Sequence, residues 1–247
     1  MDNIISVVAG GWSVSTVDLL RIPGTIIGVN DSAIRLPRCD LVVSMDRKWA
    51  EYRYDRLRQM RAPAYIRRSA LQNIRDKWPW LHSFECDHTS ETFSDQPGVL
   101  NGTNSGLCAF NLAWQMRPEK ILLFGFDMKR GPNGEAYWYK PYPWSEKGAT
   151  SSGKYAAWSK QFSRAAKQCK AAGIDVAVVG DSAIDCFRKL PASEVSPRPA
   201  CGERSDRSSD PGEGDSPHAP LCGNQDPLTP TLSPQERGEG AMERGTA

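Results

Sequence analysis

Residues 101–127, NGTNSGLCAFNLAWQMRPEKILLFGFD, indicate most clearly how this chain folds. They begin with small polar residues, continue with apolar residues spaced three and four apart, and end in the apolar run 121–124. This pattern predicts a turn, an amphipathic helix and a strand that is buried on both faces. Asp127 follows that strand, at the sheet edge where open α/β folds bind ligands. The same pattern also fits an ordinary helix–strand unit with a capped helix.

The polar turn before this helix predicts a site for an anion. Free backbone N–H groups and the positive end of the helix dipole attract negative charge at a helix start. We therefore expect an anion site within residues 101–106, which include Asn104, Ser105 and Gly106.

Three apolar runs of strand type precede this segment, at residues 4–8, 25–29 and 41–45. The residues that follow these strands are small or polar: Gly10, Gly11, Ser13, Asn30 and Asp46. Strands that alternate with helices or loops predict a parallel sheet, whose carboxyl ends share one edge. We therefore expect these residues and Asp127 to line a single cleft.

The glycines after the first strand have two interpretations. They could approach a phosphate closely, or they could form only a tight turn, since neither a P-loop nor G-x-G-x-x-G is present. Ser13 or Ser15 is expected to cap a helix that carries Val17, Leu19 and Leu20.

The remaining pattern completes an α/β fold. Expected elements are a helix at 49–60, a strand at 64–66, a helix at 71–78, an edge strand at 81–86, a helix at 155–169, a strand at 174–179 and a closing helix at 183–190. The expected fold is a Rossmann-like three-layer sandwich with a mainly parallel central sheet, formed by residues 1–192. In the helix at 155–169, Tyr155 and Trp158 are expected to belong to the core.

Residues 128–153 predict a lid, because a long irregular segment inside a domain is usually functional. Its aromatic residues are Tyr137, Trp138, Tyr139, Tyr142 and Trp144. They could close over a base, a sugar or a phosphate. Alternatively, the segment only packs against the domain or contacts a partner subunit.

Residues 193–247 predict a disordered tail. They contain eight prolines, seven glycines and no aromatic residue, so little apolar surface is available to offset the chain entropy. The tail also resembles bacterial intergenic repeats read through as protein, as in a prophage region. It carries 5 basic and 10 acidic residues, which leaves the rest of the chain basic. A basic body suits an anionic small molecule such as a nucleotide, and we do not expect nucleic acid as the main partner.

The seven cysteines form no C-x-x-C pair and show no metal-ligand spacing with the three histidines. With no signal peptide and no apolar run of membrane-spanning length, this indicates reduced thiols, no metal site and a cytoplasmic protein. The oligomeric state is not indicated.

The body resembles the bacterial sialyltransferase-like group of Rossmann-type glycosyltransferases, whose wider set includes hydroxymethylpterin diphosphokinase-like proteins. The resemblance covers about residues 4–192. It rests on the glycine loop at 9–13, Asn30, the helix start at 104–106, the strand end at 125–127 and the segment 182–187. The loop keeps Gly11 and Ser13 of the family pattern G-x-G-P-S but lacks its first glycine and its proline.

The resemblance implies that a nucleotide-activated sugar is the donor. The glycine loop and Asn30 would then contact phosphate and sugar, Asp127 would lie near the ribose, and Tyr137 or Tyr139 would steady the leaving phosphate. The family uses a lid histidine as the base, and this lid has none. Glu135 and Glu146 are the expected substitutes.

Two alternatives remain open. A nucleotide-dependent diphosphokinase would need Mg²⁺, for which Asp46 and Asp127 are candidate ligands. A non-catalytic protein would keep the cleft for a ligand or partner but lack the base. The glycosyltransferase requires no certain cofactor beyond its nucleotide-sugar donor.

Overall fold

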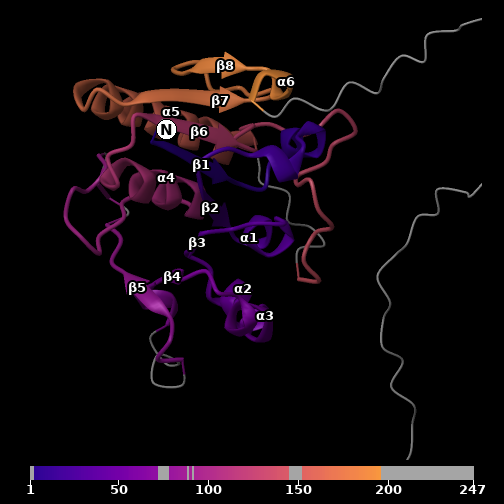
Figure 1. The fold of residues 1–247 in the computed structure, drawn as a ribbon, viewed down its shortest axis with the longest axis vertical. Helices are drawn as coiled ribbons and strands as arrows, with labels where there is room; N and C mark the ends of the chain where they lie inside the picture. The colour runs from indigo at the N-terminus through magenta and orange to yellow at the C-terminus, as the bar shows by residue number, and fades with distance from the viewer. Residues whose placement is uncertain (1–2, 72–77, 88, 91, 145–151, 196–247) are drawn as a thin grey trace, which may run out of the picture. The chain divides into compact units, whose positions relative to one another are not determined.

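The computed structural model describes residues 3–71, 78–87, 89–90, 92–144 and 152–195 (Figure 1). The chain divides into two units, Met1–Cys201 and Gly202–Ala247, and all described elements belong to the first. Most of the predicted tail and of the predicted helix at 71–78 lies outside the described residues.

The centre of the first unit is a sheet of eight strands that are all parallel. They are β1 (Ile4–Val8), β2 (Thr25–Val29), β3 (Leu41–Ser44), β4 (Ala64–Arg67), β5 (His82–Phe84), β6 (Lys120–Phe124), β7 (Asp175–Val179) and β8 (Arg188–Leu190). Their order across the sheet is β5-β4-β3-β2-β1-β6-β7-β8. The predicted parallel α/β fold is therefore confirmed, and the predicted edge strand at 81–86 is β5.

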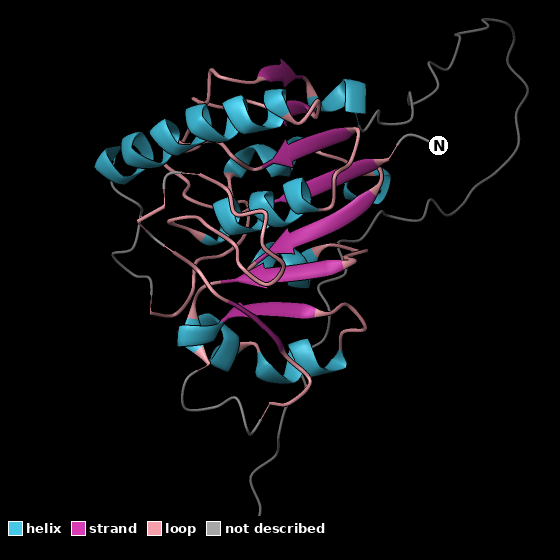
Figure 2. Ribbon diagram, turned by 90° about the vertical axis from the view of Figure 1, so that its left-hand side faces the viewer, coloured by secondary structure: helices cyan, strands magenta, loops and turns pink. Residues whose placement is uncertain are grey.

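Helices cover both faces of this sheet (Figure 2). They are α1 (Asp31–Arg35), α2 (Arg47–Tyr52), α3 (Tyr54–Gln59), α4 (Ser105–Gln115), α5 (Ser152–Ala171) and α6 (Ala192–Val195), with 3₁₀ turns η1 (Trp12–Thr16), η2 (Leu19–Arg21) and η3 (Arg68–Ala70). No helix in the described part of the chain has both the length and the apolar character needed to cross a membrane.

Successive side chains along a strand point alternately into two apolar layers, one on each face of the sheet. The fold is therefore a three-layer sandwich. In β6, Ile121 and Leu123 pack with α4 and α5, whereas Leu122 and Phe124 pack with the segment around η1. All four side chains are at most 2% exposed. Because successive strand residues point to opposite faces, an uninterrupted apolar run is what two covering layers require.

The order of the strands places a crevice at the centre of the sheet. β1 pairs with β2 on one side and with β6 on the other, in registers that bring Val8 level with Gly28 and with Phe124. The chain thus progresses in opposite directions from β1, which makes the β1/β6 boundary a topological switch point. Open α/β sheets bind ligands at the carboxyl edge of such a point.

The predicted closing helix at 183–190 is wrong. Residues 188–190 instead form β8, which pairs with β7. Pro191 disfavours the helical conformation at the residue before it, Leu190. A serine turn, in which Ile184 N donates to Ser182 Oγ at 3.0 Å, begins this segment instead.

Two further helix predictions need correction. The segment after β1 forms only η1 and η2, and the Ser13 hydroxyl bonds to Asp127 instead of capping a helix. Leu20, assigned to that helix, is 82% exposed. The predicted helix at 49–60 is two helices, α2 and α3, separated at Arg53.

Arg53, the residue between α2 and α3, binds a buried carboxylate. Asp31, fully buried at the start of α1, accepts from Arg53 Nε at 2.8 Å and from its NH2 group at 2.6 Å. Trp49 Nε1 donates to the same carboxylate at 3.0 Å, and Arg35 Nε at 3.3 Å. A buried charge persists only when paired and hydrogen-bonded, so this cluster fixes α1 against α2 and α3.

We predict that Asp31→Ala lowers the free energy of unfolding by about 3 kcal/mol, because it leaves two arginines without their buried partner. The value lies at the low end for buried pairs because the side chain of Arg53 is 23% exposed and can hydrate. Urea unfolding of the full chain measures it. The matched control is Asp185→Ala, whose exposed ion pair with Lys189 should contribute less than about 1 kcal/mol. Equal effects of the two substitutions would contradict a structural role for the cluster.

Candidate functional site

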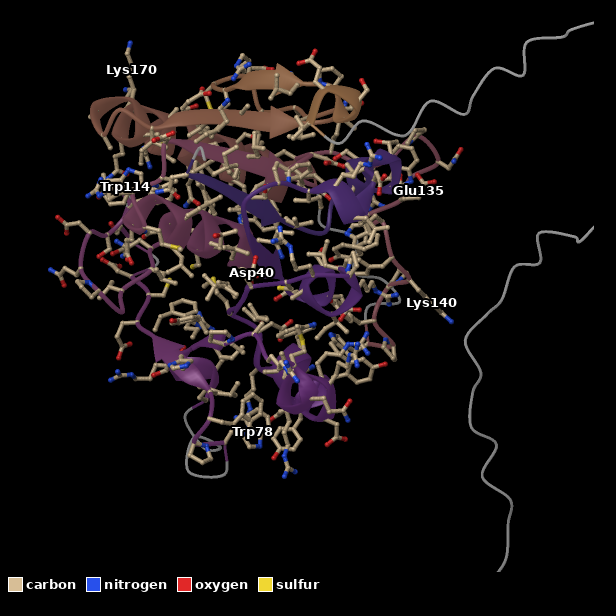
Figure 3. The ribbon with its side chains drawn as sticks, in the orientation of Figure 1. Asp40, Trp78, Trp114, Glu135, Lys140 and Lys170 are labelled. Atoms are coloured by element: carbon tan, nitrogen blue, oxygen red, sulfur yellow. The ribbon has the colours of Figure 1, made fainter. Side chains whose placement is uncertain are left out.

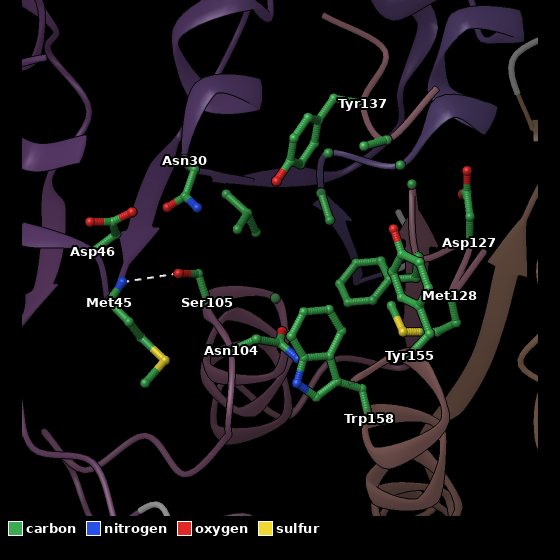
Figure 4. Close-up of a pocket in the computed structure, with 18 of the residues that line it drawn as sticks. Asn30, Met45, Asp46, Asn104, Ser105, Asp127, Met128, Tyr137, Tyr155 and Trp158 are labelled. Carbon is green, nitrogen blue, oxygen red and sulfur yellow. Dashed lines mark hydrogen bonds between the residues drawn. The ribbon is translucent and has the colours of Figure 1, made fainter. Parts of the chain in front are cut away.

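A pocket of about 550 Å³ opens at the carboxyl edge of the sheet (Figure 4). Its size is typical of small-molecule sites. The predicted site residues that line it are Gly10, Gly11, Asn30, Asp46, Asn104, Ser105, Gly106, Asp127, Tyr137 and Tyr139. Residues from four strand ends, from the start of α4 and from the lid segment therefore meet in one place, as the strand pattern predicts.

Ser13 does not line this pocket but holds Asp127, which does. The Ser13 hydroxyl donates to Asp127 Oδ1 at 2.5 Å, and the Ser13 N–H donates to Oδ2 at 2.9 Å. Gly11 N also donates to Gly125 O at 2.9 Å. A Cβ on Gly11 would lie 2.5 Å from both Gly125 O and Asp127 Oδ1, so only glycine allows the β1 and β6 loops to approach this closely.

Burial raises the pKa of Asp127 above its ordinary value, and the two hydrogen bonds from Ser13 oppose that shift. Both oxygens of the carboxylate accept a hydrogen bond from Ser13, which joins the two loops.

On its other side, Asp127 borders a second cavity, of about 210 Å³, which Ser13, Trp12, Lys129 and Asp181 also line. Lys129 Nζ donates to Asp181 there at 2.6 Å.

The start of α4 has the geometry of an anion site. Asn104 caps the helix, since its Oδ1 accepts from Leu107 N at 3.0 Å. The Ser105 hydroxyl accepts from Met45 N at 3.0 Å, which attaches the helix start to the end of β3. Helix geometry leaves the N–H groups of Ser105 and Gly106 without intrahelical partners, at the positive end of the dipole.

Two amide side chains in the pocket have buried atoms with no hydrogen-bond partner in the described part of the chain. They are Asn30 Oδ1 and Asn104 Nδ2. Asn30 also has φ +50° and ψ −130°, a conformation that favours glycine. Unsatisfied polar atoms and backbone strain both cost stability, and both concentrate at ligand sites. A ligand that donates to Asn30 and accepts from Asn104 would satisfy both.

The lid segment is docked over the pocket through Trp138. Its backbone N–H donates to Gly10 O at 3.1 Å, and its indole Nε1 donates to Ser32 Oγ at 3.1 Å. These contacts place Tyr137 and Tyr139 beside the glycine loop, where a Cβ on Gly10 would lie 2.9 Å from Tyr139 Oη.

The two lid tyrosines are stacked, with ring centroids 5.2 Å apart and planes at 7°. Burial raises the pKa of both phenols, that of Tyr139 well above its ordinary value. Both hydroxyls therefore remain protonated at neutral pH and can donate hydrogen bonds to a ligand.

Asp46 provides the second carboxylate in the pocket. It caps α2, with Oδ1 accepting from Trp49 N at 3.3 Å. Within the described part of the chain, no hydrogen bond or ion pair engages its Oδ2. Figure 4 shows Asp46 beside Asn30 and Ser105, across the open space from Asp127 and Tyr155.

Glu135, one of the two predicted catalytic glutamates, does not line the pocket. Glu135 lies at the periphery (Figure 3), where its carboxylate accepts from Asn133 N at 2.9 Å and from Asn133 Nδ2 at 3.0 Å. The pKa of Glu135 is lowered, first by a hydrogen bond from its own backbone N–H and then by the hydrogen bond from the Asn133 side chain. Glu146 lies outside the described residues.

Several lining residues were not predicted: Arg47, Arg67, Thr103, Lys129, Tyr155 and Trp158. Tyr155 and Trp158 were assigned to the core, but they are only partly buried and their rings face the pocket from α5 (Figure 4). The core residues of this helix are Phe162, Ala165 and Cys169. Arg67 ends β4, so the rule that located Asp46 and Asp127 could have located it too.

The sequence matches no protein-family model and no curated protein. Among solved structures it is similar to the sialyltransferase CstII from Campylobacter jejuni in complex with the substrate analogue CMP-3FNeuAc. That match has a TM-score of 0.50 and 13% identity over 79% of this chain and 88% of the other. The monofunctional α-2,3-sialyltransferase Cst-I from the same organism matches with a TM-score of 0.47 and 11% identity, over 79% and 80% of the two chains. The match to CstII, at a TM-score of 0.50, indicates that the chain has a sialyltransferase-like fold.

We predict that Ser13→Ala raises the pKa of Asp127 further, because it removes the hydroxyl hydrogen bond that favours the ionised form. The loss of stability should be about 1.5–3 kcal/mol at neutral pH. This loss of stability should become smaller as pH falls through the raised pKa of Asp127. The folded protein then takes up a proton on Asp127 at a pH where the unfolded chain does not. A ¹³C NMR titration of the Asp127 carboxyl and urea unfolding measure both effects.

The matched control for this experiment is Ser15→Ala. Ser15 is exposed on the same 3₁₀ turn, so its substitution should leave the titration of Asp127 unchanged. An unchanged pKa in Ser13→Ala would show that the Ser13 hydroxyl does not stabilise the ionised form of this carboxylate.

Proposed function

We propose that this protein is a glycosyltransferase that uses a nucleotide-activated sugar of the CMP-sialic acid type. The observation that carries the proposal is the single pocket at the switch point, where the glycine loop, Asn30, the start of α4 and the lid tyrosines converge. A likeness in fold to a sialyltransferase solved with CMP-3FNeuAc supports it.

The charges of the pocket suit a donor with two negative groups. Arg47, Arg67 and Lys129 line it, together with the N-terminus of α4. A CMP-sialic acid carries one phosphate and one carboxylate. The helix start offers N–H groups for one of these anions, and the arginines offer guanidinium groups for the other.

The side-chain amides of Asn30 and Asn104, each with a buried atom that has no hydrogen-bond partner in the described part of the chain, suit the remaining polar groups of such a donor. Asn30 Oδ1 needs a donor, which a sugar hydroxyl or the amino group of a cytosine supplies. Asn104 Nδ2 needs an acceptor, such as a phosphate, carboxylate or carbonyl oxygen. A bound ligand would thus remove two desolvation penalties of the free protein.

The lid tyrosines suit the chemistry of sugar transfer. As the bond between the anomeric carbon and the phosphate breaks, negative charge grows on the departing phosphate. Protonated phenols on Tyr137 and Tyr139 are placed over the pocket to donate to it. A docked lid also keeps water from the activated sugar.

Thermal unfolding of the full chain with CMP, CDP, UDP, GDP or ATP, each with and without Mg²⁺, tests this function. We predict a shift with CMP that does not need Mg²⁺. At about 100 times the dissociation constant, CMP should add about 2.7 kcal/mol, which is a rise of several degrees in Tm. A response to ATP only with Mg²⁺ would favour a diphosphokinase instead. No response to any nucleotide would contradict both enzymes.

Substitution of Asn30 by glycine separates stability from binding. We predict that Asn30→Gly raises the free energy of unfolding by about 1 kcal/mol, since relief of a strain of about 1–3 kcal/mol exceeds the entropy cost of glycine. The same change should weaken CMP binding, because the Asn30 side chain, which lines the pocket, is lost. Urea unfolding and titration calorimetry measure the two effects.

The matched control for that substitution is Arg117→Gly. Arg117 has φ +52° and does not line the pocket, so glycine there should also stabilise the protein yet leave CMP binding unchanged. If Asn30→Gly bound CMP as tightly as the wild-type protein does, Asn30 would have no role in the ligand site.

A further inference from the structure

We propose that Asp46 is the general base that accepts the proton of the acceptor hydroxyl. The inference rests on the proposed function and assigns the one role that it leaves open. Sugar transfer from a nucleotide donor requires a group that removes this proton as the oxygen attacks the anomeric carbon.

The lining of the pocket narrows the choice to two carboxylates. Among the described residues that line it, Asp46 and Asp127 are the acids, and no histidine is present. The lid tyrosines are protonated at neutral pH because burial raises the pKa of their phenols, so they act as donors. Glu135 lies outside the pocket and is bound to Asn133.

Asp127 is poorly placed for this role because its oxygens are already occupied. Oδ1 accepts from the Ser13 hydroxyl at 2.5 Å, and Oδ2 accepts from the Ser13 N–H at 2.9 Å. Protonation would disrupt the link between the β1 and β6 loops. This carboxylate is therefore a structural element of the pocket wall.

Asp46 has the opposite arrangement. Its Oδ1 accepts from Trp49 N, which orients the carboxylate at the start of α2, and its Oδ2 is left to accept a proton. The preceding residue, Met45, donates its N–H to Ser105 Oγ at 3.0 Å. The base is thus attached through the backbone to the helix start that is proposed to hold an anion of the donor.

The proposed step is balanced. The acceptor O–H bond breaks and its proton passes to Asp46 Oδ2, while the oxygen's electron pair forms the bond to the anomeric carbon. The bond between that carbon and the phosphate oxygen breaks, and the nucleoside monophosphate leaves with the electron pair. Asp46 then returns the proton to solvent.

Asp46→Asn tests this assignment without disturbing the fold. Asparagine caps a helix as well as aspartate does, so α2 should be retained, but an amide cannot accept the proton. Release of CMP from CMP-N-acetylneuraminic acid is measured with the full chain, with water or added sugars as the acceptor. We expect kcat to fall by about 10²–10⁴-fold while the dissociation constant for CMP changes little.

Asp55→Asn is the matched control, since Asp55 is exposed on α3 and does not line the pocket. It should release CMP at the wild-type rate. An Asp46→Asn rate close to that of the wild-type protein would overturn the assignment and leave the proposed function intact. Loss of CMP binding in Asp46→Asn would also overturn it, by making Asp46 a binding residue. If the wild-type protein released no CMP from any nucleotide sugar, the proposed function would fail and this inference with it.

Discussion

Asp127 joins three loops at the switch point of the sheet. Its side chain binds the loop after β1 through Ser13, and its backbone oxygen accepts from Ala183 N at 2.8 Å in the segment after β7. Asp127 itself follows β6. Because these loops follow three neighbouring strands, β1, β6 and β7, Asp127 sets the distances between them at the edge of the pocket. The close approach then restricts the loops further, since Gly11 has no room for a Cβ and Gly125 has φ +69°.

On the opposite side of the pocket, Asn30 and Asn104 destabilise the free protein, and a bound ligand would remove this cost. Asn30 has a strained backbone and a buried oxygen without a partner in the described part of the chain, and Asn104 has a buried nitrogen in the same condition. Asp31, next to Asn30, is by contrast fully buried and hydrogen-bonded by Arg53 and Trp49. The strongly held residue thus supports the strained one. This division is expected of a binding site, where rigid supports hold groups that are left open for a ligand.

The strand pattern allowed the fold and most of the pocket to be predicted, because a single rule covers both. Parallel strands must end at one edge, so Gly10, Asn30, Asp46 and Asp127 could be grouped without knowledge of any contact. Tyr155 could not be placed in this way. Its position in an apolar stripe is the same as that of a core residue, and only the placement of α5 relative to the sheet determines that its ring faces the pocket. The pairing of Ser13 with Asp127, 114 residues apart, depends on tertiary structure in the same manner.

Which residues donate hydrogen bonds in the pocket, and which can accept a proton there, also depends on tertiary structure. From sequence alone, acids on the lid were the natural candidates for the base, because the family that the sequence resembles uses a lid histidine for this role. The described part of the lid brings phenols to the pocket, and burial keeps those of Tyr137 and Tyr139 protonated. A displacement reaction needs donors where the phosphate leaves and an acceptor where the hydroxyl attacks. In the proposed transfer reaction, phenols on the lid and an open carboxylate oxygen at the end of β3 would meet the two requirements from separate elements, so the proposed base need not be a lid residue.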